Sequence, residues 1–478
     1  MAKEQTTFDV IIIGAGPAGY VAAIRCAQLG LNTAIVDRWK GKKNNHKLGG
    51  TFLNSGCIPS VSLRESARHY HLAKNQLKEH GIKISDISLD LKATIRRKDR
   101  IIEKISGQIG QLFDDYGIHC IYGSGKLLEE KTVEVTPRSG SPKVKHIKAD
   151  NIILAAGSRA LHLDCAPIDR EMVIDSYAAM NLETVPKKLG IIGAGVIGLD
   201  HGCVWSRFGS KVTLLDAQSS ILPFADEQIV DQAKPHFSEM GLDIRLCARV
   251  TSVKKTANQV VVHYEDPDGQ HQLKVDKLLV AAGRKPNTDD LFAQETDLLL
   301  DEGGFVHVDE NCMTNLPGVY AVGDLITGPM LAHKGSEEGS YVAEQIAGKS
   351  ETLNSGAIPN VIYTDPEIAW VGKTEQELRA AGEPIAIGTC SLESNTAAQA
   401  RGLSEGMVKI IAHQETDQIL GIHILGHNAS ELIAEAVVAM EFSASTEDLA
   451  RTIHAHPSFA EAIHQAALDI TSRALQVN

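Results

Sequence analysis

The ten residues VIIIGAGPAG, from Val10 to Gly19, return in closely similar form as LGIIGAGVIG, from Leu189 to Gly198. Each copy is an apolar run of strand length, a glycine-rich turn and the start of a helical stretch. An acidic residue ends the next apolar run about 20 residues further on, namely Asp37 after the first copy and Asp216 after the second. This spacing is typical of a dinucleotide-binding βαβ unit. The sequence therefore predicts two such units in one α/β chain.

The residue types in these units indicate how a nucleotide would bind. Glycine permits a tight turn and lets backbone N–H groups approach a pyrophosphate at a helix N-terminus, while the acid accepts a hydrogen bond from a ribose hydroxyl. Nothing basic follows Asp216 directly, since the next residues are Ala217, Gln218 and Ser219. A carboxylate would repel a 2′-phosphate, so the second unit is expected to take NAD rather than NADP.

Length and composition narrow the function classes. A chain of 478 residues is long enough for about three domains. The 60 acidic and 47 basic side chains leave a formal charge of −13, which argues against a nucleic-acid partner. No apolar stretch reaches the ~18 residues of a membrane span and no signal-peptide pattern begins the chain, so no membrane partner is expected. The eight cysteines form no CxxC pair, which favours a reduced, cytoplasmic setting.

The remaining pattern predicts a third, α+β domain at the C-terminal end. Before it, an apolar strand at 278–282 precedes Gly283, and a second strand ends at Gly323 and Asp324, where ligands of open α/β sheets bind. The last 120 or so residues alternate short strands and helices. The strands are expected at 361–364, 407–411 and 419–424, and the helices at 431–442 and 457–470. The run 40–47 is expected to be a solvated loop.

Five long strings carry a resemblance that covers essentially the whole chain. They are LGGTFLNSGCIPS (48–60), VAAGRKPNT (280–288), GPMLAHK (328–334), IPNVIYTDPEIAWVG (358–372) and HAHPSFAE (454–461). With the two dinucleotide units, they make the chain similar to the pyridine nucleotide–disulfide oxidoreductases, and most similar to the dihydrolipoamide dehydrogenases among them. The resemblance implies a glutathione-reductase-like fold with two Rossmann-like domains and a C-terminal α+β dimerisation domain. The implied limits are 1–158 and 284–350 for the FAD-binding domain, 159–283 for the NAD-binding domain and 355–478 for the C-terminal domain.

The same resemblance implies the cofactors, FAD and NAD(H), and the site residues. FAD is expected on the first unit and NAD(H) on the second. The cofactor-binding residues are expected to be Gly14, Gly16, Gly19, Asp37, Gly50, Thr51, Gly157, Gly193, Gly195, Gly198, Asp200, Asp216, Gly283, Gly323 and Asp324. Cys57, His456 and Glu461 are expected to be catalytic, and no metal site is expected. In the family a homodimer shares each active site, so His456 as the base and Glu461 as its orienting partner would act on the other subunit.

The chain departs from the family where the chemistry is expected. Phe52 stands where the first cysteine of the redox pair is expected, so Cys57 matches the flavin-side thiol alone. Phenylalanine cannot ionise or form a disulfide. Val61 replaces the lysine beside the flavin, and Asp200 replaces its glutamate partner. A unit charge about 4 Å away is worth about 4 kcal/mol at an effective dielectric near 20, or about 90 mV for a two-electron couple, so the flavin potential is expected to fall.

Three functions remain open. The favoured one is an FAD-dependent NADH oxidoreductase, resembling dihydrolipoamide dehydrogenase, that passes hydride between NAD(H) and FAD and then reduces an unknown acceptor. The second is a working dihydrolipoyl dehydrogenase that uses an external second thiol. The third is a non-catalytic paralogue that keeps FAD and the dimer as a scaffold, with Cys57 as a small buried hydrophobe. Both dinucleotide units and the His456–Glu461 pair favour the first over the third.

Overall fold

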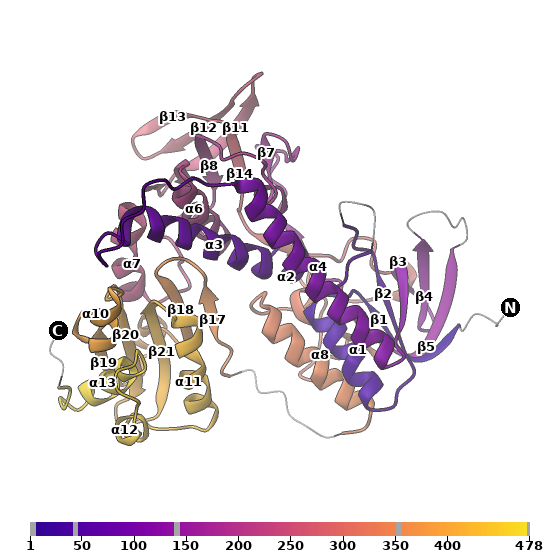
Figure 1. The fold of residues 1–478 in the computed structure, drawn as a ribbon. Coiled ribbons are helices and arrows are strands. Elements are labelled where there is room, and N and C mark those ends of the chain that lie inside the picture. Colours follow the sequence, from indigo (N-terminus) through magenta and orange to yellow (C-terminus); the bar gives the residue numbers. More distant parts are fainter. Residues whose placement is uncertain (1–5, 42–45, 138–143, 350–355, 476–478) are drawn as a thin grey trace.

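The computed structural model describes residues 6–41, 46–137, 144–349 and 356–475 (Figure 1). The first region has a six-stranded sheet and the helices around it. Its strands are β1 (Thr7–Ile13), β2 (Thr33–Asp37), β3 (His119–Leu128), β4 (Thr132–Pro137), β5 (Lys145–Leu154) and β16 (Val319–Ala321). Its helices are α1 (Pro17–Gln28), α2 (Gly50–Asn54), α3 (Cys57–His71), η1 (Leu72–Gln76), α4 (Leu91–Asp115), η2 (Gln294–Thr296), η3 (Gly323–Leu325) and α8 (Ala332–Ile346).

The parallel part of this sheet runs in the order β3-β2-β1-β5-β16. Strand β4 pairs antiparallel with both β3 and β5. Residues Val10 to Ile13 of β1 are at most 4% exposed, because helices cover both faces of a parallel sheet. The first predicted strand, turn and helix therefore form the centre of this region.

The second region repeats the plan with a five-stranded parallel sheet in the order β10-β9-β8-β14-β7. Its strands are β7 (Val173–Ile174), β8 (Lys188–Ile192), β9 (Lys211–Leu215), β10 (Leu242–Arg245) and β14 (Lys277–Val280). Its helices are α5 (Ser176–Ala179), α6 (Val196–Phe208) and α7 (Glu227–Glu239). An antiparallel sheet of β11 (Arg249–Lys255), β12 (Val260–Asp266) and β13 (Gly269–Val275) extends from it, at the top of Figure 1.

The chain crosses between these two regions twice, and the two crossings are hydrogen-bonded to each other. Strand β6 (Ser158–Ala160) pairs antiparallel with β15 (Arg284–Pro286). This two-stranded ribbon holds the exit from the first region against the return to it. The predicted domain limits near 158 and 284 lie at this ribbon, and as exact limits they stay a prediction.

The C-terminal region has an antiparallel sheet in the order β17-β18-β21-β20-β19. Its strands are β17 (Asn360–Ile362), β18 (Glu367–Gly372), β19 (Ile385–Ser391), β20 (Met407–His413) and β21 (Ile419–Gly426). Its helices are α9 (Glu375–Ala380), η4 (Leu392–Ser394), α10 (Thr396–Arg401), α11 (Ala429–Glu441), α12 (Thr446–Arg451) and α13 (Glu461–Asp469). The three strands and two helices predicted here are confirmed. However, α13 begins four residues later than predicted, because Ser458 donates its N–H to the Glu461 carboxylate in a turn before the helix.

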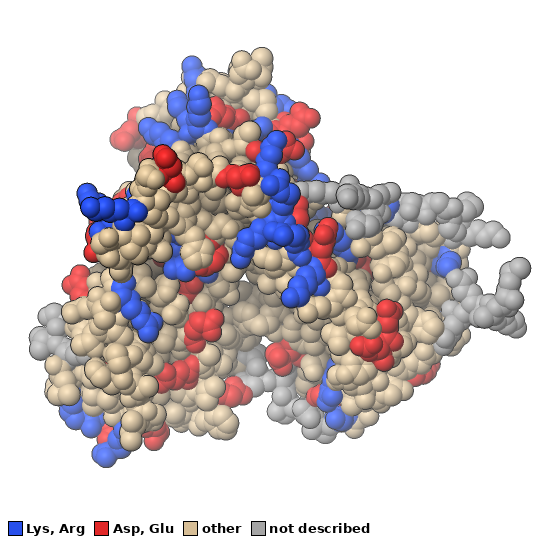
Figure 2. Space-filling view, viewed as in Figure 1, with Lys and Arg blue, Asp and Glu red and all other residues tan. Residues whose placement is uncertain are grey.

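Several expectations fall partly outside the described residues. Residues 42–45 of the predicted loop at 40–47 lie outside them, as do the predicted limits at 350 and 355. Figure 2 shows acidic and basic side chains interspersed over the visible face. Within the described ranges, no helix is long and apolar enough to cross a membrane.

Candidate cofactor and active site

The first glycine turn joins β1 to α1 and leaves no room for a side chain at Gly14 or Gly19. Gly14 has a φ of +111°, and a Cβ there would lie 2.3 Å from the carbonyl oxygen of Ala155. A Cβ on Gly19 would lie 1.8 Å from the carbonyl oxygen of Gly14, so α1 can begin this close to the strand only with glycine here. At the end of β2, Asp37 accepts a 3.1 Å hydrogen bond from the Ala15 N–H. Burial raises the pKa of Asp37.

The second turn, between β8 and α6, has the same construction. Gly193 has a φ of +103°, and a Cβ there would lie 2.4 Å from the carbonyl oxygen of Ala281. A Cβ on Gly198 would lie 1.9 Å from the carbonyl oxygen of Gly193. Asp216, directly after β9, accepts a 2.6 Å hydrogen bond from the Ala194 N–H. The repeated sequence thus folds into repeated geometry.

A cleft of about 820 Å³ runs from the first turn to α3 and α6. The predicted residues that line it are Gly14, Gly16, Asp37, Gly50, Thr51, Cys57, Gly157, Asp200, Gly323 and Asp324. Gly19 shapes the turn from behind, and the residues of the second unit that do not line the cleft are Gly193, Gly195, Gly198, Asp216 and Gly283. Helix α6 contributes its N-terminal face to the cleft through Val196, Ile197, Asp200 and His201.

Sequence reasoning missed a basic side chain in this cleft, Arg284. Its Nε donates to Ser158 Oγ at 2.8 Å and its Nη2 donates to the Ser158 carbonyl oxygen at 2.8 Å. Ser158 Oγ in turn donates to Asp324. Burial lowers the pKa of Arg284, but a guanidinium stays charged at neutral pH. The string 280–288 contained this residue, yet its contact with Ser158 depends on the pairing of β6 with β15.

Cys57 begins α3 and is exposed to the cleft. Desolvation by the surrounding protein raises the pKa of its thiol, and the charge of Asp200 raises it further. Phe52, on α2, lines the same cleft and packs against Tyr20 with 6.2 Å between ring centroids. All eight cysteines are free. Among the described residues that line the cleft, Cys57 is the only cysteine.

Two adjacent residues of α6 have strongly shifted pKa values. Burial raises the pKa of Asp200 to about 6, although a hydrogen bond from Ser60 and the charge of Arg64 oppose the rise. Its Oδ1 has no hydrogen-bond partner among the described residues. Burial lowers the pKa of His201 to about 4. At pH 7 the cleft therefore faces a carboxylate and a neutral imidazole, while the half-buried Val61 provides no cation.

The predicted His456–Glu461 pair is formed within the C-terminal region. His456 Nδ1 lies 2.9 Å from Glu461 Oε1, and Glu461 Oε2 accepts the Ser458 N–H at 2.9 Å. Two bonds to one carboxylate hold Glu461 in place, so it can orient the imidazole. The His456 side chain is 69% exposed, and neither residue is among those described as lining the cleft of its own chain.

Two glycine turns of this kind, a cleft lined from both units and a separate C-terminal α+β region define a class of two-nucleotide oxidoreductases. The chain belongs to the pyridine nucleotide-disulphide oxidoreductase family, whose model matches residues 8–339. The dimerisation domain of the same family matches residues 358–467. The glutathione-reductase-like fold is thereby confirmed, and the dimerisation domain supports formation of a homodimer.

Dihydrolipoyl dehydrogenases are similar to this chain along its length. The enzyme from Cupriavidus necator is 44% identical and covers 100% of both chains. The mitochondrial enzyme from Dictyostelium discoideum is 42% identical over 96% of this chain and 94% of that protein. Leghemoglobin reductase from Vigna unguiculata is 40% identical over 96% of this chain and 87% of that protein. Among solved structures, the HOCl-induced flavoprotein disulfide reductase RclA from Escherichia coli is 26% identical, with a TM-score of 0.85, over 96% of this chain and 99% of that chain.

The chain is therefore an oxidoreductase of a family whose dihydrolipoyl dehydrogenases use FAD and NAD(H). The residues present fit both cofactors. A Cβ on Gly157 would meet no atom within 4 Å, so the backbone here faces open cleft that a bound group could approach. Gly195, at the N-terminus of α6, has equally open space before it.

Proposed function

We propose that this protein is an FAD-dependent NADH oxidoreductase that passes hydride between NAD(H) and FAD without a redox-active disulfide of its own. One observation carries the proposal. Phe52 occupies the wall of the cleft at the place that the family resemblance gives to the first cysteine, and its ring packs against Tyr20. Cys57 is left as the only cysteine among the described lining residues. One sulfur cannot form an intramolecular disulfide.

In this proposal the site residues divide between the two cofactors. FAD would be held by Gly14, Gly16, Gly19, Asp37, Gly50, Thr51, Gly157, Gly323 and Asp324, and NAD(H) by Gly193, Gly195, Gly198, Asp216 and Gly283. Asp200 would lie between them, because α6 lines the FAD cleft beyond the second glycine turn. When bound, the flavin supplies two-electron chemistry. Arg284 places a positive charge beside Asp324, where it would compensate negative charge brought by a cofactor.

The chain's own acid–base groups would act around this centre. Cys57 would enter the reaction as a thiol, because desolvation and Asp200 raise its pKa. His456, oriented by Glu461, would exchange protons with the acceptor on the partner subunit. The proposal covers any acceptor that takes two electrons, such as a quinone, a dye, a second nicotinamide or a small disulfide. A reduced, cytoplasmic location is part of the proposal, since all eight cysteines are free.

A second candidate is dihydrolipoyl dehydrogenase activity with the second sulfur supplied by another molecule. The 44% identity to such an enzyme over the whole chain favours it, as does the intact His456–Glu461 pair. Against it stands Phe52, an aromatic side chain on the wall of the same cleft as Cys57 that supplies no second sulfur of the chain's own. The relative named leghemoglobin reductase illustrates that the names in this family refer to more than one acceptor.

Anaerobic titration of the purified holoenzyme with NADH tests the proposal. We expect the oxidised-flavin absorbance to bleach, an added acceptor to restore it, and turnover of dihydrolipoamide with NAD⁺ to stay at background. A flavin that stays oxidised with excess NADH would instead favour a non-catalytic scaffold. Brisk dihydrolipoamide turnover without an added thiol would overturn the proposal.

A pair of double variants tests the role of Phe52. Phe52→Cys with Val61→Lys restores both groups of the family pattern, and we expect it to gain dihydrolipoamide activity. Phe52→Ser with Val61→Lys opens the same space without adding a sulfur and serves as the matched control. Activity in the control equal to that of the cysteine variant would show that space, rather than the missing sulfur, limits the reaction.

A further inference from the structure

Helix α7 packs against the C-terminal domain and carries charged residues at both of its ends. At its N-terminus, Asp226 receives hydrogen bonds of 2.8 and 3.0 Å from Lys409 Nζ, on β20. The same ammonium lies 2.6 Å from Glu375 Oε2. The Lys409 side chain is 1% exposed, and its single positive charge pairs with two carboxylates from two domains, the buried Asp226 and the 26% exposed Glu375.

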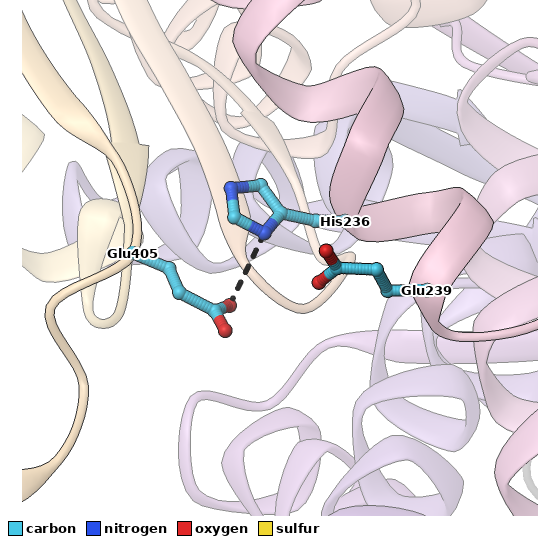
Figure 3. A group of neighbouring side chains, drawn as sticks. All are labelled: His236, Glu239 and Glu405. Atoms are coloured by element: carbon cyan, nitrogen blue, oxygen red, sulfur yellow. Dashed lines mark ion pairs between the residues drawn. The ribbon is translucent and has the colours of Figure 1, made fainter.

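At the C-terminal end of α7, two carboxylates again meet from two domains, but the third group is a histidine. His236 and Glu239 lie on the last turn of α7, and Glu405 lies in the loop before β20 (Figure 3). One nitrogen or oxygen atom from each side chain lies within 4.8 Å of the others. His236 Nδ1 is buried and has no hydrogen-bond partner among the described residues.

The distance between the His236 imidazole and the Glu405 carboxylate distinguishes a direct hydrogen bond from two ligands of one metal ion. His236 Nδ1 lies 3.4 Å from Glu405 Oε2. A charge-assisted hydrogen bond between a protonated imidazole and a carboxylate is shorter, about 2.7–2.9 Å. Two ligands of a tetrahedral ion, each about 2.1 Å from it, lie about 3.4 Å apart. The distance is therefore long for a direct bond and suits two ligands of one metal ion.

The backbone positions of the three residues are set before any ion binds, and the side chains of Glu239 and Glu405 are exposed, so an ion can reach them from solvent. His236 and Glu239 are three residues apart on one helix, so they share a face. The loop of Glu405 is fixed by Gly406, whose φ is +116° and whose added Cβ would lie 2.0 Å from the carbonyl oxygen of Leu425. Leu392 also donates its N–H to the Gly406 carbonyl oxygen at 2.9 Å.

We propose that His236, Glu239 and Glu405 form a binding site for a divalent transition-metal ion, such as Zn²⁺, that links α7 to the C-terminal domain. An imidazole nitrogen with two carboxylates is a donor set that Zn²⁺ accepts, and water completes the fourth position. The ion does at this end of the helix what Lys409 does at the other. It offsets the repulsion of two carboxylates and ties two domains together.

Isothermal titration with Zn²⁺ on the full-length, EDTA-treated holoenzyme tests the site. The thiols are alkylated first, because Cys57 and Cys247 are exposed and thiolates bind zinc. We expect one ion per chain and a rise in the thermal unfolding midpoint on binding. Glu405→Gln and His236→Ala should each weaken the Kd at least tenfold and abolish that rise.

A matched control separates this site from any histidine that lies near a carboxylate. His162 lies 3.7 Å from Asp164, and both are exposed. His162→Ala should leave the Zn²⁺ stoichiometry, the Kd and the midpoint shift unchanged. No Zn²⁺ binding by the wild-type chain, or equal binding by wild type, Glu405→Gln and His236→Ala, would overturn the proposal.

Discussion

The two dinucleotide units share one backbone design but differ in what surrounds it. In the first, α2 closes over the turn, and a Cβ on Gly50 would lie 2.5 Å from the Gly16 Cα. In the second, a Cβ on Gly195, the equivalent of Gly16, would meet nothing within 4 Å. The same motif can thus form part of an enclosed nucleotide site or of an open one. The difference comes from segments distant in sequence rather than from the motif.

The helices that follow the two turns differ in the same way. Two and three residues after Gly19 come Val21 and Ala22, and the fully buried Ala22 would contact a Cβ on Gly339 at 3.3 Å. The corresponding residues after Gly198 are Asp200 and His201. Helix α8 packs tightly on the first helix at Gly339, so only a small side chain fits at Ala22. The second helix packs against α3 instead, and its half-buried Asp200 and buried His201 carry titratable groups to the wall of the cleft.

The largest expected effect comes from filling the closest contact of each turn. Gly19→Ala and Gly198→Ala each place a Cβ within 2 Å of a backbone oxygen, which should destabilise the local structure by about 3 kcal/mol. Gly19→Ala should lose FAD, while Gly198→Ala should keep FAD and lose NADH binding. Flavin absorbance per chain and NADH titration measure the two outcomes. Gly107→Ala, in open space on α4, is the control, and equal loss of FAD from both turn variants would end the distinction between the units.

The next effect is a loss of folding stability in acid that arises from His201, in the second unit. His201 would titrate near pH 6.5 in the unfolded chain but only near pH 4 in the folded one. Because the unfolded chain binds the proton first, the folded state should lose about 3 kcal/mol as the pH falls from 6.5 to 4. His201→Gln should remove this loss, seen as a smaller decline of the unfolding midpoint with acid. His162→Gln, on the surface, should follow wild type, and an unchanged decline in His201→Gln would contradict the assignment.

A smaller effect tests whether α2 encloses the first glycine turn while the second turn stays open. Gly50→Ala should lower stability and flavin retention by about 2 kcal/mol, because the new methyl group meets the Gly16 backbone in a left-handed conformation with φ of +57°. Gly195→Ala should leave the unfolding midpoint within the range of surface substitutions. Thermal unfolding monitored by flavin fluorescence gives both numbers. If Gly195→Ala lowers the unfolding midpoint as much as Gly50→Ala does, the second turn is as enclosed as the first.

The smallest effect concerns the acid of the open unit. Asp216→Ala removes a carboxylate that accepts the Ala194 N–H and that is expected to bind the ribose, so NADH affinity should fall about tenfold, or about 1.4 kcal/mol. Discrimination against NADPH should weaken as well, since the repelling charge is gone. Steady-state KM values for the two nucleotides measure this. A variant that keeps both would place the ribose elsewhere.

Some residues of the candidate site could be predicted from the sequence, and others could not. The glycine turns and both acids were predictable because each follows a fixed spacing within one βαβ unit, and the His456–Glu461 pair was expected from the family resemblance of residues 454–461. Arg284 was not identified, since its partner Ser158 is 126 residues away and meets it only through the β6–β15 ribbon. The His236–Glu239–Glu405 cluster was likewise missed, because two of its residues look like ordinary surface charges of a helix until the loop of Glu405 packs beside them.

The sequence alone determines the properties that belong to single residues, namely the backbone conformations they tolerate and the chemical groups they carry. Glycine is the one residue that tolerates the turn conformations at 14 and 193, and phenylalanine at position 52 cannot supply a thiol, whatever the fold around it. Burial and long-range contact account for the rest. The depth of the cleft, the opposite pKa shifts of Asp200 and His201, and the meeting of α7 with Glu405 all arise when distant segments exclude water from one another, and no short stretch of sequence contains that information.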